Sequence, residues 1–199
     1  MRTFSRLVSI EVFTHIDIYQ RLIQGERELL KRACEVRNNA QAPYSNYWVG
    51  CAVLGKNGHT EVGCNVENGN WSETVHAEEN AISSMVSKFG PFSIRAMAVV
   101  GAPADKEISW PPVRRAQLES RHIQCVQDVC PSCGHCLQLI AENCFDEKGL
   151  YDPSVVLLGY NEGSGEVYRT TIGHAYPMPF LPQHLGINYA KDPRAQKNF

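Results

Sequence analysis

The sequence NVENGNWSETVHAEEN at residues 65–80 organises the chain, together with PSCGHC at residues 131–136. His76 offers a nitrogen donor, and Cys133 and Cys136 offer thiolates; these three donors suit the corners of a zinc tetrahedron. Three protein ligands leave the fourth corner to water, which is the arrangement of catalytic rather than structural zinc. The two segments therefore predict one catalytic zinc ion per chain.

Glu78 follows His76 by two residues, with only the small Ala77 between them. A carboxylate at this spacing can reach a metal-bound water without itself ligating the metal. An H-x-E pattern paired with a downstream C-x-x-C is the signature of zinc deaminases that act on nucleosides and nucleobases. We therefore expect Glu78 to be the catalytic proton carrier.

Cys130 leaves the register of the second motif open, because it also forms a C-x-x-C pair with Cys133. We favour Cys133 and Cys136, since the amphipathic run that follows places this pair at a helix start. A closed site of His76 and all three cysteines would instead describe a non-enzymatic zinc protein, and it would leave Glu78 without a role.

Composition narrows the class of protein. A chain of 199 residues with 43% hydrophobic residues can bury the core of one large domain. The formal net charge of −2 and the scattered basic residues do not indicate a nucleic-acid partner. No apolar run is long enough to cross a membrane. Eight cysteines without a signal peptide favour a reduced, cytoplasmic enzyme, with organelle targeting by residues 1–7 as the alternative.

Periodicity predicts helices at 17–38 (with a possible break at Gly25), 76–89 and 134–143, and strands at 48–54, 61–66, 94–101, 122–126, 155–158 and 166–171. This order predicts a three-layer α/β/α sandwich with a mixed central sheet. Both metal motifs then lie at helix N-termini, where the helix dipole is expected to lower the pKa of the cysteines. We expect an extension at 1–16, a catalytic domain at 17–187 with an insertion at about 104–121, and a polar tail at 188–199.

Several segments also resemble one known family. The run APYSNYWVGCAV at residues 42–53 is similar to the opening segment of cytidine deaminases. The motifs NVEN at 65–68, HAE at 76–78, CGHCLQ at 133–138 and FLPQHLG at 180–186 follow in that family's order. The resemblance implies the cytidine-deaminase fold and zinc-dependent hydrolysis of cytidine or deoxycytidine to uridine or deoxyuridine plus ammonia, in pyrimidine salvage.

The resemblance also implies roles for substrate-binding residues. Asn65 and Glu67 match the residues that bind the ribose 3′-hydroxyl. Tyr47 stands where the family places an aromatic residue on the pyrimidine ring. The main chain at Ala77 and Ser132 would bind the polar edge of the base.

A homo-oligomer is implied as well. Leu185 stands where family members usually carry a phenylalanine that closes the site of a neighbouring subunit. The His-Ala-Glu form of the first motif is similar to the dimeric branch of the family, which favours a dimer over a tetramer.

Three features depart from the family pattern. Ser132 replaces a usual proline, Leu137 replaces a usual arginine, and an insertion precedes the second motif. With one histidine and two thiolates the charges of zinc and ligands sum to zero, so we expect leucine to be tolerated at 137. The departures leave two alternatives open: a deaminase of a modified or related aminopyrimidine nucleoside, and an inactive zinc-binding homologue.

A polynucleotide-editing deaminase would share the zinc site, but it needs a basic groove and stacking aromatic residues. The net charge argues against this reading. Glu67 also argues against a polynucleotide substrate, because a carboxylate at the ribose 3′-hydroxyl leaves little room for the phosphate that continues the strand.

Overall fold

The computed structural model describes residues 9–104, 131–163, 165–195 and 198. The strands in this part of the chain are β1 Glu11–Thr14, β2 Tyr47–Gly55, β3 Thr60–Cys64, β4 Ile94–Pro103, β5 Val156–Asn161 and β6 Glu166–Thr171. The α-helices are α1 Ile18–Arg21, α2 Gln24–Arg37, α3 Ala77–Phe89, α5 Gly134–Glu142 and α6 Ile172–Ala175. Short 3-10 turns occupy η1 His15–Asp17, η2 Trp71–Glu73, η3 Pro182–Leu185 and η4 Tyr189–Lys191.

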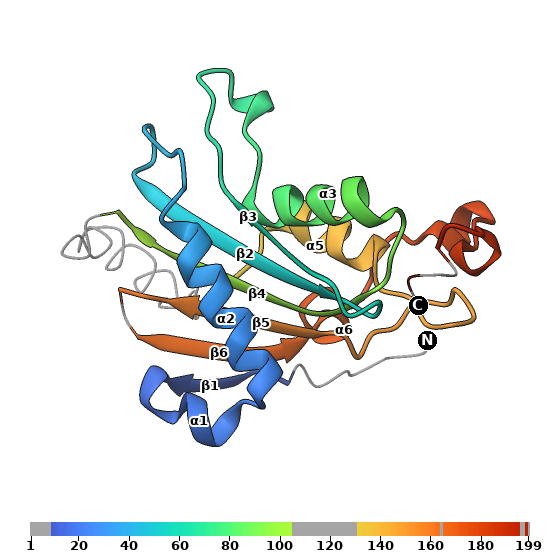
Figure 1. Cartoon of the computed structure of the whole chain (residues 1–199), viewed down its shortest axis with the longest axis horizontal. Coiled ribbons are helices and arrows are strands. Elements are labelled where there is room, and N and C mark those ends of the chain that lie inside the picture. Colours follow the sequence, from blue (N-terminus) through green and yellow to red (C-terminus); the bar gives the residue numbers. More distant parts are fainter. Residues whose placement is uncertain (1–8, 105–130, 164, 196–197, 199) are drawn as a thin grey trace, which may run out of the picture.

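The strands form one mixed sheet in the order β1-β6-β5-β4-β2-β3. Strands β4 and β5 run parallel, and the other neighbouring pairs are antiparallel. Helix α2 covers one face of this sheet, and α3 and α5 cover the other (Figure 1). The predicted three-layer architecture with a mixed sheet is therefore confirmed.

Side-chain alternation along the central strands separates two apolar clusters. In β2, Cys51 and Val53 pack with α3 and α5, whereas Ala52 packs with α2. The same alternation in β4 sends Met97 to the α3 and α5 side and Ala98 to the α2 side. Period-two alternation thus lets one strand supply both layers of core.

Two glycines permit close contact between helices and sheet. A Cβ at Gly50 would lie 2.1 Å from the carbonyl oxygen of Ala33, so α2 rests directly on β2. A Cβ at Gly63 would lie 2.4 Å from the backbone nitrogen of Ala81, so α3 rests directly on β3. The second contact lies near the start of α3, which begins immediately after the predicted metal ligand His76.

The predicted helix at 17–38 is divided, as its glycine suggested, but the break falls at Leu22 and Ile23 and leaves Gly25 inside α2. Strand β1 was not predicted; it pairs with β6 at the edge of the sheet. The predicted strand at 122–126, nearly all of the insertion, and Cys130 lie outside the described residues.

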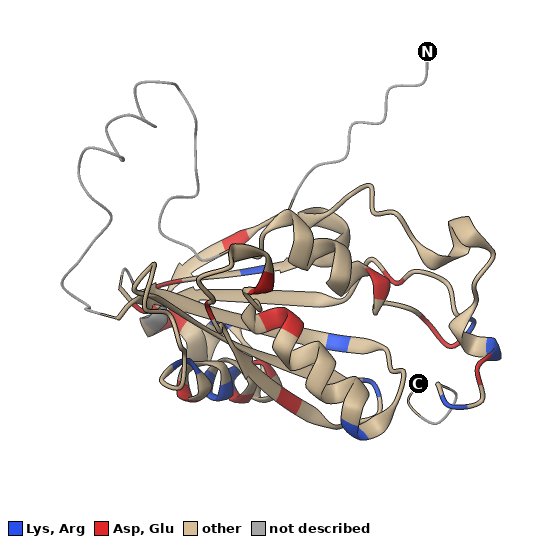
Figure 2. Cartoon of the chain, turned by 90° about the horizontal axis from the view of Figure 1, so that it is seen from above, with Lys and Arg blue, Asp and Glu red and all other residues tan. Residues whose placement is uncertain are grey.

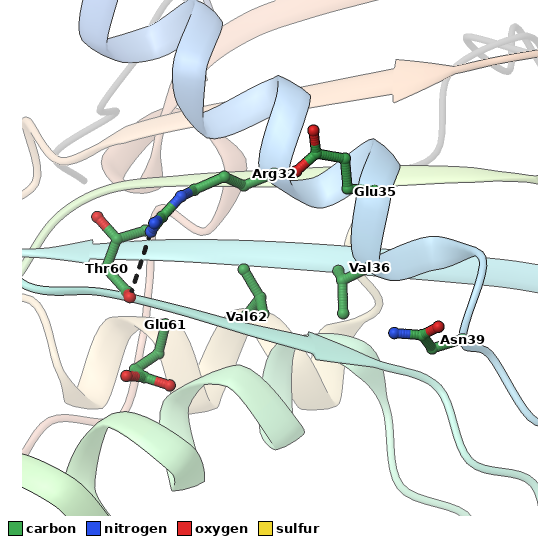
Figure 3. Close-up of a pocket in the computed structure, with 7 residues that line it drawn as sticks. All are labelled: Arg32, Glu35, Val36, Asn39, Thr60, Glu61 and Val62. Carbon is green, nitrogen blue, oxygen red and sulfur yellow. Dashed lines mark hydrogen bonds between the residues drawn. The ribbon is translucent and has the colours of Figure 1, made fainter.

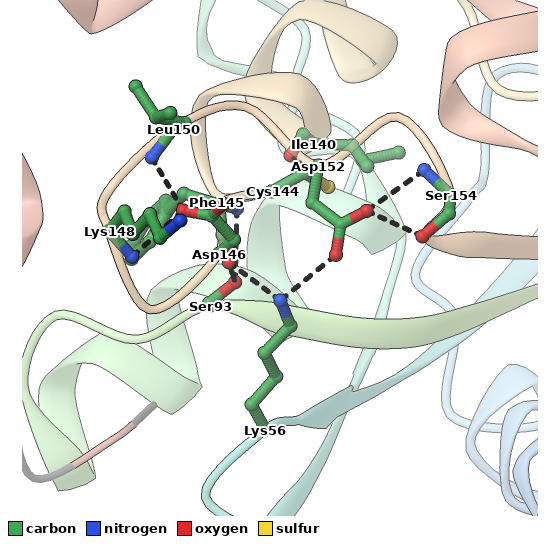
Figure 4. A network of polar contacts seen from close by, with 10 residues as sticks. All are labelled: Lys56, Ser93, Ile140, Cys144, Phe145, Asp146, Lys148, Leu150, Asp152 and Ser154. Atoms are coloured by element: carbon green, nitrogen blue, oxygen red, sulfur yellow. Dashed lines mark hydrogen bonds and ion pairs between the residues drawn. The ribbon is translucent and has the colours of Figure 1, made fainter.

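A polar network attaches the segment after α5 to the sheet (Figure 4). Lys56 donates to the carbonyl of Phe145 at 2.7 Å and to Asp152 Oδ2 at 3.0 Å. The Ser93 hydroxyl donates to the same carbonyl. Burial raises the pKa of the Asp152 carboxyl, but hydrogen bonds from Ser154 and Lys56 outweigh it and hold this pKa below its ordinary value.

The polar C-terminal segment packs against the domain through a buried amide. Asn198 is 7% exposed, and its Nδ2 lies 2.9 Å from the carbonyl oxygens of both Phe89 and Pro91. Its Oδ1 accepts from Asn57 at 3.2 Å. The amide thereby joins the end of α3 to the turn between β2 and β3.

We expect Asn198→Ala to lower the free energy of unfolding by about 1–3 kcal/mol, because it leaves the half-buried carbonyls of Phe89 and Pro91 without this donor. Urea denaturation of the full chain measures this loss. Asn39→Ala, at an exposed position after α2, is the control and should change stability little. Equal stability of both variants would contradict a structural role for Asn198.

Candidate metal centre and active site

The three predicted metal ligands lie at the starts of two helices. His76 is the N-cap of α3 and Cys133 is the N-cap of α5, both with extended backbone. Cys136 lies in the first turn of α5 and is buried. Because α3 and α5 cover the same face of the sheet, their N-termini bring residues 60 positions apart into one group.

The spacing of these donors fits zinc. His76 Nδ1 lies 3.2 Å from Cys136 Sγ and 3.5 Å from Cys133 Sγ. All three ligand atoms lie within 4.8 Å of one another. Ligand bonds of ordinary length around a tetrahedral zinc would separate nitrogen from sulfur by about 3.5 Å. The donor set and its spacing therefore both suit one zinc ion held through His76 Nδ1.

Glu78 lies beside this group. It belongs to the first turn of α3, is 5% exposed, and contacts the Cys136 thiol. Burial, followed by the charges of Glu78 and Cys133, raises the pKa of the Cys136 thiol. The expected lowering by the helix N-terminus is thus outweighed at Cys136, and a bound cation has to displace its proton.

Glu67 holds the loop that leads into β2, and Asn65 holds the first residues of that strand. Asn65 Oδ1 accepts from the Val49 backbone at 2.8 Å, and its Nδ2 donates to the Tyr47 carbonyl at 2.9 Å. Glu67 Oε2 accepts from the backbone nitrogens of Tyr44 and Ser45 at 2.9 and 3.1 Å.

These contacts also set the charge of Glu67. Burial raises the pKa of its carboxyl, but the hydrogen bonds from Ser45 and Tyr44 outweigh it and lower that pKa below the ordinary value. Glu67 therefore remains an acceptor for a hydroxyl group at neutral pH.

Tyr47 and Trp48 lie on opposite faces of β2, as expected for neighbours in a strand. Trp48 faces α2, where the guanidinium of Arg37 lies 5.8 Å from its ring centroid. Tyr47 shares the face of Cys51, which is the face covered by α3 and α5. Of the remaining predicted contacts, Ala77 is fully buried at the start of α3, and Ser132 directly precedes the α5 N-cap.

Leu185 is 67% exposed on η3. The segment that carries it is attached to α5 by Gln138, whose side chain donates to the Phe180 carbonyl and accepts from the Phe180 backbone nitrogen at 3.2 Å. The Tyr176 hydroxyl donates to the same amide at 3.3 Å. The sequence contained Gln138 within a motif but did not indicate this contact.

Leu137 and His135 are the sequence neighbours of Cys136. Leu137 packs against the apolar cluster beneath α5, so an arginine at this position would meet apolar side chains. The ring of His135 lies edge-on to that of His76, with centroids 5.9 Å apart. His135 lies between the two candidate ligand cysteines in the sequence, but that position did not predict its contact with the His76 ring.

An open hollow of about 380 Å³ lies between α2 and β3 (Figure 3). It is lined by Arg32, Glu35, Val36, Asn39, Thr60, Glu61 and Val62, and so contains none of the metal group. Acidic and basic residues are interspersed along the ribbon, including on α2 (Figure 2). Among the described residues, no helix combines the length and apolar character needed to span a bilayer.

Zinc-dependent deaminases join a His/Cys/Cys metal group to a nearby carboxylate that is not a ligand, and this is the class to which the fold and site point. The chain belongs to the cytidine and deoxycytidylate deaminase family, because the zinc-binding region of that family matches residues 24–148. The family assignment also supports zinc as the metal.

Individual relatives support the same family assignment. The cytidine deaminase of Sporosarcina psychrophila is 30% identical over 158 residues, covering 79% of this chain and 93% of that protein. The cytidine deaminase of Halalkalibacterium halodurans is 29% identical over 157 residues, covering 79% and 95%. The crystal structure of cytidine deaminase from Burkholderia pseudomallei has a TM-score of 0.57 at 26% identity, covering 80% of this chain and 100% of that one. The expected family and fold are thereby confirmed.

Proposed function

We propose that the protein is a cytidine deaminase, a hydrolase that converts cytidine or deoxycytidine and water into the uracil nucleoside and ammonia. The observation that carries this proposal is the buried Glu78 carboxylate beside the His76, Cys133 and Cys136 donors. A purely structural zinc site needs no such carboxylate.

When bound by His76, Cys133 and Cys136, zinc supplies a Lewis acid that lowers the pKa of a coordinated water to roughly 7. Glu78 accepts a proton from water and delivers it to N3 of the cytosine ring, so that the remaining hydroxide can form a bond with C4. A second proton transfer through the same carboxylate lets the amino group leave as ammonia. Burial of the Glu78 carboxylate limits the exchange of these protons with bulk water.

The pocket residues have complementary roles in this proposal. Glu67 and Asn65 receive the ribose 3′-hydroxyl, while Glu67 also holds the loop before β2 and Asn65 the first residues of that strand. Tyr47 packs on the pyrimidine ring from the site face of the sheet. The main chain at Ala77 and Ser132 binds the polar edge of the base, and both residues adjoin metal ligands.

Ammonia release from a panel of nucleosides by the zinc-loaded protein tests this function. The panel contains cytidine, deoxycytidine, cytosine, 5-methylcytidine and adenosine. Turnover of cytidine and deoxycytidine, with none of free cytosine, is the expected result. Turnover of 5-methylcytidine alone would favour the modified-nucleoside alternative, and inactivity of protein holding one zinc per chain would contradict a deaminase of these substrates.

Glu67→Gln should raise the KM for cytidine about tenfold, because a hydrogen bond to a charged acceptor is replaced by a weaker one. The comparison substrate is 3′-deoxycytidine, which lacks the hydroxyl that Glu67 is proposed to receive. The KM for this analogue should be almost the same in wild type and variant. An equal rise for both nucleosides would instead assign Glu67 a role only in holding the loop.

A closed, non-enzymatic zinc site with Cys130 as fourth ligand is the competing function. Cys130 lies outside the described residues, so the alternative rests on sequence spacing alone. Cys130→Ala separates the two cases. Zinc content and turnover should both persist if the site is catalytic, whereas loss of zinc would favour the closed site.

We further propose a cytoplasmic homodimer that acts in pyrimidine salvage, with the catalytic domain at 17–187. The exposed Leu185 on η3 supports a contact with a second copy, in agreement with its position in the family motif. Sedimentation of the wild-type protein and of Leu185→Asp measures this association. If the variant remains a dimer to the same extent, Leu185 is not part of the interface.

A further inference from the structure

Arg37, the last residue of α2, is a buried cation. It is 2% exposed. Its Nη1 lies 2.7 Å from Glu162 Oε2, in the turn between β5 and β6. A buried charge is costly unless it is paired and its hydrogen-bonding capacity is used, and Arg37 meets both conditions.

The other donors of Arg37 hold the ends of two paired strands. Nε donates to the Trp48 carbonyl at 3.1 Å, at the start of β2. Nη2 donates to the carbonyls of Ala102 and Pro103 at 3.0 Å each, at the end of β4. Trp48 and Ala102 are register partners in the β2–β4 ladder. One guanidinium thus fixes both strands where their pairing ends.

The same stretch of β2 is held from its other edge by Asn65, which binds the carbonyl of Tyr47 and the backbone nitrogen of Val49. Backbone groups of three consecutive residues are therefore hydrogen-bonded by Arg37 on one side and Asn65 on the other. The Trp48 ring also lies against the Arg37 guanidinium. With Trp48 held on the α2 face, Tyr47 is directed to the face of the metal group.

We infer that Arg37 is a positioning residue for the nucleoside pocket: it sets the place of Tyr47 through the backbone of β2, without touching the substrate. The inference rests on the proposed function, in which Tyr47 packs on the base. This role accounts for the buried Arg37 cation at this end of the sheet, where the metal chemistry requires no charge.

Arginine is needed here because four acceptors must be met by one rigid, planar group. Lysine retains the charge that faces Glu162, but a single ammonium cannot reach the carbonyls of both strands. Arg37→Lys therefore loosens the strand ends, while it still leaves a cation to face the half-buried Glu162 carboxylate. A displacement of about 1 Å in a positioning element can change catalytic efficiency by up to roughly 10²-fold.

The experiment measures kcat and KM for cytidine in wild type, Arg37→Lys, Tyr47→Ala and the double variant. Arg37→Lys should raise KM about tenfold and leave kcat within about twofold, because Glu78 and the zinc ligands stay in place. In the Tyr47→Ala background the same change should have almost no effect on KM, since the residue through which Arg37 acts is gone.

The matched control is Arg169→Lys, which alters another arginine held by an acidic residue on α2. Arg169 binds Glu26 Oε1 through Nε at 3.1 Å and Nη2 at 3.0 Å. This variant should lose stability and keep its KM. The thermal unfolding temperature of every variant is measured alongside the kinetics. This temperature distinguishes a general loss of stability from a local change at the pocket.

An unchanged KM in folded Arg37→Lys would overturn the inference, as would the same rise in KM with and without Tyr47. Absence of cytidine turnover in the zinc-loaded wild type would instead refute the proposed function. If Arg37→Lys does not fold, Glu162→Gln tests the same anchor, because it removes the charge that orients the guanidinium and should raise KM in the same Tyr47-dependent way.

Discussion

Replacing Glu78 by glutamine should lower turnover of cytidine by about 10²–10⁴-fold, the usual contribution of a general acid–base group. Glutamine fills the same buried position, but it can neither accept the proton of water nor deliver one to N3. Because the side chain is not a metal ligand, zinc content should stay at one per chain. Ammonia release and metal analysis of the same preparation measure both quantities.

Glu79→Gln is the matched control for this prediction. Glu79 is the next residue of α3, and its carboxylate faces the backbone nitrogen of His76 at 3.5 Å, where glutamine can still accept. The control should retain most of its activity. A Glu78→Gln protein that keeps a substantial fraction of wild-type turnover would refute Glu78 as the proton carrier.

Replacing Cys136 by serine should remove both the metal and the activity. A hydroxyl is a poor zinc ligand compared with a thiolate, and His76 with Cys133 alone cannot complete the site. Zinc per chain should fall from one to near zero. The thermal unfolding temperature should also fall toward that of chelator-treated wild type, because a bound ion stabilises the folded state.

Cys34→Ala is the control, because Cys34 is a half-buried cysteine outside the metal group. Burial and the nearby Glu162 carboxylate raise the pKa of its thiol to about 12, so this thiol stays protonated at neutral pH. Its removal should leave zinc content unchanged. Retention of a full zinc complement by Cys136→Ser would favour the register through Cys130.

The family and the metal group could be predicted from the sequence, because zinc accepts few ligand types and the spacing around His76 and Cys133 is local. Helix starts at these residues were predictable for the same reason: the apolar periodicity of α3 and α5 begins just after them. The long apolar run of β4 likewise predicted a central strand, and it occupies the middle of the sheet.

Contacts between distant segments were decided only by the tertiary structure. Arg37 and Glu162 are 125 positions apart, and no periodicity or motif relates them. Strand β1 has only four residues, too few for a periodicity to be recognised, and its backbone pairs with the edge of β6.

The NVEN segment at residues 65–68 shows the same division. Asn65 and Glu67 could be recognised at the family's spacing from the sequence, because a local pattern is sufficient for that. Tertiary packing alone sets the contact of Glu67 with the loop before β2, and the contacts by which Asn65 and Arg37 hold the start of that strand. The physical reason is that a hydrogen bond needs direction and distance, and packing of the sheet against α2 and α3 sets both.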